Sequence, residues 1–167
     1  MNNNVIKAIT RNGLVAAIYF LLTFLLGAIS YRDIQVRISE VLLLLCFFRR
    51  DYVIGLSIGC FFANMVGDMG IIDAVFGTLA TFVSGLIISY MKNLFVATLF
   101  PVIINAFVVG AELYFLLDLP FWYNVLFVGI GEFIAVSILG YAIFMLIGKR
   151  KSFHEIIMAK QNFNFKW

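Results

Sequence analysis

Long apolar runs alternate with short polar interruptions along almost the whole chain. The interruptions contain charged or turn-forming residues in the strings SYRD, RRD, GDMGIID, MKN and LDLP. Because about 20 helical residues cross a bilayer, each run between two interruptions is a candidate membrane-spanning helix. The predicted spans are residues 12–29, 38–48, 52–66, 73–91, 94–116 and 122–147, of which the second and third are short.

Composition favours a membrane protein over a soluble domain. The 167 residues are 63% hydrophobic and 13% charged, whereas soluble domains carry roughly 25% charged residues. Only two prolines interrupt the apolar runs, which suits packed helices better than the alternating strands of a membrane barrel. We therefore predict an all-α integral membrane protein, with one transmembrane domain over residues 1–167 that includes a tail at 148–167.

Lysine and arginine set the expected orientation, because they are enriched in cytoplasmic loops. Placing the N-terminus inside puts ten of the twelve Lys and Arg residues in the cytoplasm and leaves Arg32 and Arg37 outside. We predict a multi-pass protein of the bacterial cytoplasmic membrane with both termini cytoplasmic. The net charge of +3 is explained by this topology and indicates no nucleic-acid partner.

The tail and the two cysteines complete this picture. His154, the single histidine, is expected to be solvated, and Cys46 and Cys60 to be buried small hydrophobes, since no Cys or His lies at metal-ligand spacing. No metal site or cofactor is therefore predicted. Apolar tail residues among basic ones are typical of a short amphipathic helix lying on anionic membrane lipid. These residues are Phe153, Ile156, Ile157 and Phe163.

With this topology, the polar residues in and beside the spans gather toward the outer side of the membrane. Glu132 lies about ten residues into the sixth span, where an ionisable side chain is costly unless it faces a cavity or a partner. Asn64 and Asp68, and likewise Asn105 and Glu112, are spaced to share one helix face. The predicted substrate-binding residues are Gln35, Arg37, Glu40, Asn64, Asp68, Asn105, Glu112, Trp122 and Glu132.

Two of these assignments have structural alternatives. Trp122 belongs to a group of aromatic residues at the outer ends of the spans, which could instead form an interfacial belt. Arg37 and Glu40 lie one helical turn apart and could simply pair with each other. Both alternatives stay open at the level of sequence.

Several strings resemble one transporter family over nearly the whole chain. They are NGLVAAIYFLLT, IQVRISEVLLLL, GLSIGCFFANM, DAVFGTLAT, PVIINAFVVGAEL and FWYNVLFVGIGEFIAVSILGY. The chain resembles the S components of energy-coupling factor (ECF) transporters, and among them the QueT family of queuosine-precursor transporters. The resemblance implies a six-helix bundle that binds substrate outside the cell and docks on a transmembrane coupling subunit with two cytoplasmic ATPases.

The resemblance also implies roles for individual residues. In related S components an Ala-xxx-Ala face of the first helix meets the coupling subunit, and here Gly13 and Ala17 occupy those positions. A small-xxx-small face allows close helix approach, although it could equally pack inside the subunit. The connection SYRDIQVRISE corresponds to the segment that closes over the ligand, so Gln35, Arg37 and Glu40 would be lid or rim groups.

The implied ligand is a 7-deazaguanine such as 7-aminomethyl-7-deazaguanine. A carboxylate can accept the adjacent N1–H and N2–H donors of a guanine edge, and O6 needs an amide or guanidinium donor. The ammonium group needs a second carboxylate or an aromatic face. Another cationic heterocycle, such as thiamine, would need similar groups and remains the alternative substrate.

Other function classes fit less well. The chain has no GxxxxGKS/T loop, so ATP hydrolysis would come from separate subunits. No catalytic residues are predicted, because no histidine lies in a span and HExxH does not occur. A stand-alone carrier stays possible, whereas a channel would need polar rings along a pore.

Overall fold

The computed structural model describes residues 3–26, 37–67 and 69–165, and every regular element in these residues is a helix. The prediction of an all-α membrane protein is confirmed. The elements are α1 (Asn3–Leu25), η1 (Ile38–Leu44), α3 (Leu45–Phe48), α4 (Tyr52–Met65), α5 (Ile71–Ile88), α6 (Leu94–Leu117), α7 (Phe121–Glu132), η2 (Phe133–Gly140), α8 (Tyr141–Ile147) and α9 (Lys151–Ile156).

The six predicted spans correspond to six helical segments in the described chain. Four of these are long and apolar enough to cross a membrane: α1, α5, α6 and the continuous segment from α7 to α8. The segments Ile38–Phe48 and Tyr52–Met65 are shorter. The main difference from the prediction is at the start of α1, which begins at Asn3 rather than residue 12. The helix continues through Lys7 and Arg11 because long basic side chains can extend their charged ends away from the apolar surface.

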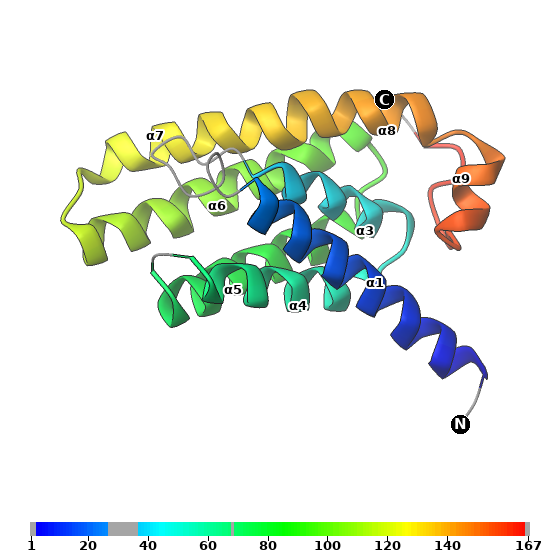
Figure 1. The fold of residues 1–167 in the computed structure, drawn as a ribbon. Coiled ribbons are helices and arrows are strands. Elements are labelled where there is room, and N and C mark those ends of the chain that lie inside the picture. Colours follow the sequence, from blue (N-terminus) through cyan, green and yellow to red (C-terminus); the bar gives the residue numbers. More distant parts are fainter. Residues whose placement is uncertain (1–2, 27–36, 68, 166–167) are drawn as a thin grey trace.

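The helices lie side by side in one bundle (Figure 1). Helix α1 packs on α4, and from α4 onward neighbours along the chain pack together, with α4 on α5, α5 on α6, and α6 on α7. The short segment of η1 and α3 runs through the middle and contacts α1, α5 and η2. Its residues Leu43, Leu44, Cys46, Phe47 and Phe48 have no exposed surface. The second predicted span is therefore the central helix of the bundle.

The backbone conformation of η1 increases the length that this short segment covers along its axis. Residues 38–44 form a 3₁₀-helix, which rises about 2.0 Å per residue compared with about 1.5 Å in an α-helix. Seven residues in this form cover roughly 14 Å instead of roughly 10 Å. A helix that is short in residues thus comes closer to the length of its neighbours.

Two glycines of α4 set the contact between α4 and α1. A Cβ atom at Gly59 would lie 2.7 Å from the backbone oxygen of Ala16 and 2.9 Å from Cβ of Tyr19. A Cβ atom at Gly55 would lie 2.7 Å from the backbone oxygen of Asn12. Contacts this short do not occur between real atoms, so the two helices approach as closely as they do only because both positions lack a side chain.

We expect Gly59→Ala to lower the free energy of unfolding by about 1 to 3 kcal/mol, because the added methyl group overpacks the contact between α1 and α4. Gly13→Ala is the matched control on α1, since nothing lies within 4 Å of a Cβ atom there. It should leave stability unchanged or raise it by up to about 1 kcal/mol. Denaturation of both variants in detergent measures the difference, and equal stability would contradict the proposed close contact.

The tail folds back on one end of the bundle, where the start of α1 and helix α9 also lie (Figure 1). The side-chain amide of Gln161 donates to the backbone oxygens of Phe47 (3.1 Å) and Ser89 (2.7 Å). The Asn162 amide donates to those of Phe47 (2.7 Å) and Met91 (2.9 Å). Carbonyl groups at helix C-termini have no partner inside the helix. The tail therefore caps the ends of α3 and α5.

This arrangement differs from the amphipathic helix predicted for the tail. Helix α9 ends at Ile156. Ile156 and Phe163 are exposed, as the prediction requires, but Ile157 is buried against the bundle together with Phe165. His154 was expected to be solvated but is half-buried, with its ring 5.4 Å from that of Phe48 and 5.2 Å from that of Phe163. The reason is that the exposed ends of α3 and α5 offer these residues both hydrogen-bond acceptors and apolar surface. Cys46 and Cys60 are buried, as predicted.

Candidate functional site

Polar side chains from the main helices are buried together inside the bundle. Residue Tyr19 comes from α1, and the others come from η1 with the residue before it, from α4, α5 and α6, and from the end of α7. All have at most 5% of their surface exposed, and they include all the buried charged residues of the described chain. The members of this polar cluster are Tyr19, Arg37, Glu40, Asn64, Asp73, Thr81, Asn105, Glu112 and Glu132.

Arg37 forms an ion pair with Asp73. Its Nη2 lies 3.5 Å from each carboxylate oxygen, and the two side chains are only 4% and 2% exposed. Asp73 is in the first turn of α5, where the helix dipole favours a negative charge. The Nε of Arg37 has no hydrogen-bond acceptor among the described residues. Arg37 thus pairs across the bundle rather than with Glu40, which was the structural alternative at the sequence level.

Glu40 is held by α1 instead. The Tyr19 hydroxyl donates to its Oε1, whereas the nearby Thr81 hydroxyl of α5 donates to the sulfur of Cys60 at 3.2 Å. The other oxygen, Oε2, is buried without a donor among the described residues. Gly59 lets α4 approach the α1 backbone at Ala16 and the Cβ atom of Tyr19. The close contact of α1 and α4 therefore also positions the phenol that binds Glu40.

Asn64 and Asp73 are joined through a glycine. The Asn64 amide nitrogen donates to the backbone oxygen of Asp73 at 3.0 Å. Gly77 lies one turn after Asp73, and a Cβ atom there would be 2.2 Å from the same amide nitrogen. The missing side chain of Gly77 therefore makes room for Asn64. The amide oxygen of Asn64 stays buried without a donor in the described structure.

Glu112, Asn105 and Glu132 form the part of the cluster on α6 and α7. The Asn105 side chain lies within hydrogen-bonding reach of Glu132. Oε2 of Glu132 and both carboxylate oxygens of Glu112 are buried and accept no hydrogen bond from a described residue. Glu112 is close enough to Asp73 and Arg37 for their charges to act on it. As the sequence spacing predicted, Asn105 and Glu112 both face the interior.

The backbone is irregular where two of these acids are attached. Glu40 lies in the 3₁₀-helix η1, and Glu132 is the last residue before η2, an eight-residue π-helix that packs against η1. Long 3₁₀ segments and π-helices are uncommon and occur frequently at functional sites. Both deviations from α-helical geometry thus meet beside the polar cluster.

The arrangement leaves mainly acceptors without partners. Among the cluster residues there are four carboxylates, Glu40, Asp73, Glu112 and Glu132, and one guanidinium, Arg37, so full ionisation would give a charge of 1 − 4 = −3. Buried polar atoms without partners are costly. The cluster is therefore chemically suited to a ligand that is rich in N–H donors and carries a positive charge.

The other predicted site residues lie elsewhere. Gln35 and Asp68 fall outside the described residues. Trp122 is 72% exposed at the start of α7, and the structure does not bring it to the cluster, which agrees with the interfacial alternative. The sequence interpretation did not include Tyr19 or Asp73. A tyrosine one helical turn before Thr23 inside an apolar helix was the available signal for the former.

The chain is similar to known proteins over most of its length. A profile of the QueT transporter family matches residues 9–149. The chain belongs to this family. It is 34% identical over 155 residues to the queuosine precursor transporter QueT of Lactococcus lactis subsp. cremoris (strain MG1363), with 82% of this chain and 89% of the relative covered. No solved structure matches the chain.

Membership makes the protein a transporter, and its apolar helices make it a multi-pass membrane protein. All nine members of the polar cluster lie within the matched range of 9–149. The cluster is therefore part of the family's shared segment. The tail beyond residue 149 lies outside it.

Proposed function

We propose that the chain is the substrate-binding S component of an ECF importer and that the polar cluster binds a 7-deazaguanine precursor of queuosine. The observation that carries this proposal is a set of buried acceptor atoms on Glu40, Asn64, Glu112 and Glu132 that receive no hydrogen bond from the described residues. The printed name of the relative from Lactococcus lactis, a queuosine precursor transporter, supports the same substrate class.

The cluster offers what such a ligand needs. A free carboxylate edge, such as that of Glu112, can accept the two adjacent N–H donors of the guanine ring. The unpartnered Nε of Arg37 is a donor for O6. The remaining carboxylates can bind an aminomethyl ammonium group in a charge-assisted contact.

The proposed partners are a transmembrane coupling subunit and two cytoplasmic ATPases. Gly13 and Ala17 are both exposed on α1, and a Cβ atom at Gly13 would meet nothing within 4 Å. A small, exposed helix face supports docking of a second membrane protein rather than packing inside this chain. The Lys and Arg distribution supports cytoplasmic termini, and the substrate would then enter the cluster from the extracellular side.

Calorimetry on the purified protein tests the substrate. We expect 7-aminomethyl-7-deazaguanine to bind roughly 10-fold to 100-fold more tightly than its 7-cyano analogue, because only the former adds a charged hydrogen-bond donor. Guanine and thiamine are the comparison ligands. Tight binding of thiamine without binding of either 7-deazaguanine would contradict the proposal and favour an S component for another cationic heterocycle.

A further inference from the structure

A second polar site lies at the end of the bundle where α1 begins, away from the polar cluster. A pocket of about 540 Å³ is formed there by α1, the turn between α3 and α4, and the tail. Its charged lining residues are Lys7, Arg11, Arg49, Asp51 and Lys160. Four cations face one carboxylate, so the net charge is 4 − 1 = +3.

One carboxylate oxygen of Asp51 forms ion pairs with three of these cations. Its Oδ2 lies 2.7 Å from Arg49, 3.2 Å from Arg11 and 3.5 Å from Lys160. Partial burial alone would raise the pKa of Asp51, but the hydrogen bond and charge of Arg49, with the charges of Lys160 and Arg11, lower it overall. Asp51 is therefore ionised at neutral pH, and the positive excess remains.

The two arginines differ in how well they are satisfied. Arg49 donates through Nε and Nη2 to Asp51 and through Nη1 to the backbone oxygen of Met158 at 2.6 Å. Arg11 has a side chain only 10% exposed, yet its Nε has no acceptor among the described residues and its Nη1 contacts only the Met158 sulfur, at 3.8 Å. A deeply buried guanidinium thus keeps donors free for an anion in the pocket.

We propose that this pocket binds the phosphate of an anionic glycerophospholipid. A phosphate oxygen would accept from the free donors of Arg11, and the exposed ammonium groups of Lys7 and Lys160 would neutralise the remaining charge. Basic pockets between membrane helices near the bilayer surface suit such headgroups. The site does not depend on which substrate the polar cluster binds.

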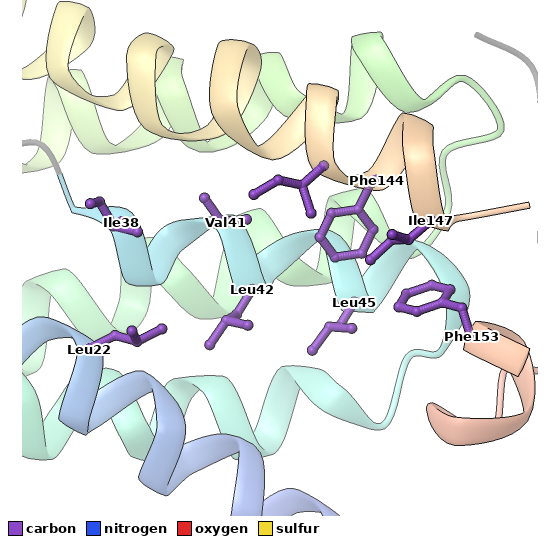
Figure 2. Close-up of a pocket in the computed structure, with 9 residues that line it drawn as sticks. Leu22, Ile38, Val41, Leu42, Leu45, Phe144, Ile147 and Phe153 are labelled. Atoms are coloured by element: carbon purple, nitrogen blue, oxygen red, sulfur yellow. The ribbon is translucent and has the colours of Figure 1, made fainter. Parts of the chain in front are cut away.

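An apolar groove beside the pocket favours a lipid over free phosphate. The groove, of about 310 Å³, is lined by α1, η1, α3, α8 and Phe153 and runs along the helices from Leu22 and Ile38 toward Phe153 (Figure 2). Leu45 lines the groove, and one turn later Arg49 lines the pocket. On α1, Leu22 follows Arg11 by eleven residues, about 17 Å along the same helix face. An acyl chain extending from the phosphate would match this direction and length.

Native mass spectrometry of the detergent-purified protein tests the site, with phosphatidylglycerol and phosphatidylcholine as probes. We expect phosphatidylglycerol to bind at least about 10-fold more tightly, since the pocket favours net negative headgroups. The variant Lys7→Gln/Lys160→Gln should lose roughly 30-fold in this affinity, because it removes two charges from the pocket without removing a buried side chain. Arg11→Gln is the second variant. It should weaken the binding of phosphatidylglycerol at least as much as the replacement of one of the two lysines.

The matched control is Lys92→Gln/Lys151→Gln, which removes two exposed charges at the same end of the bundle but outside the pocket. It should change the affinity by less than about 3-fold. Equal losses of affinity for phosphatidylglycerol in both double variants would overturn the proposal, and so would the absence of any preference for this lipid. Either result would mean that the lipid is attracted by the general surface charge and not by the pocket. If millimolar inorganic phosphate displaced bound phosphatidylglycerol as effectively as added lipid does, the pocket would be a site for free phosphate, and the proposal would also be overturned.

Discussion

Glu132→Gln is expected to weaken binding of 7-aminomethyl-7-deazaguanine by roughly 30-fold to 1,000-fold, because a buried charge-assisted contact becomes a neutral one. Glu132 is 1% exposed, and no described residue donates a hydrogen bond to its Oε2, which leaves this oxygen available to the ligand. Glutamine has nearly the same shape, so the helices should pack unchanged. Calorimetry measures the affinity, and circular dichroism checks the helix content.

Asp118→Asn is the matched control for this carboxyl-to-amide change. Asp118 is exposed and ends α6 with a φ of 53°, in the left-handed region that asparagine also tolerates. The control should therefore keep the wild-type affinity within about 3-fold. If Glu132→Gln also keeps it, Glu132 has a structural role in the cluster, and Glu40 and Glu112 become the acids to test next.

Ala17→Leu is expected to abolish stable association with the coupling subunit while substrate affinity stays within about 3-fold of wild type. A leucine on the face formed by Gly13 and Ala17 would hold apart two helices that need to approach closely. Ala17 is exposed, so a larger side chain there can extend away from the described residues of this chain. Only 17% of the apolar window of α1 is buried, compared with 44% in α5 and α6, which leaves this helix free for a partner. Co-purification of the tagged protein with its partner subunits gives the result.

Ala142→Leu makes the same substitution at an exposed position of α8 and should leave co-purification unchanged. Normal recovery of the partners with Ala17→Leu would show that docking uses another surface. Loss of the partners with both variants would mean that the assembly is sensitive to any larger side chain on the lipid-facing surface, and the assignment of the α1 face would fail.

The sequence by itself determined the fold class and most of the acids in the cluster. Apolar runs of sufficient length can be stable only as membrane helices, because backbone polar groups in lipid must bond within the helix. For the same reason a carboxyl group inside such a run, such as Glu132, had to face other polar groups. The shared face of Asn105 and Glu112 followed from helix periodicity, and both side chains are buried in the structure.

Only the tertiary structure decided which polar groups meet. The pairs Arg37–Asp73 and Tyr19–Glu40 join residues 36 and 21 positions apart, and helix periodicity relates only residues within a few turns of one helix. The free faces of helices are also invisible to a local pattern. Gly13 and Gly59 are both glycines within helices, yet Gly13 faces open space and Gly59 touches the α1 backbone, because the contact depends on how two separate helices pack.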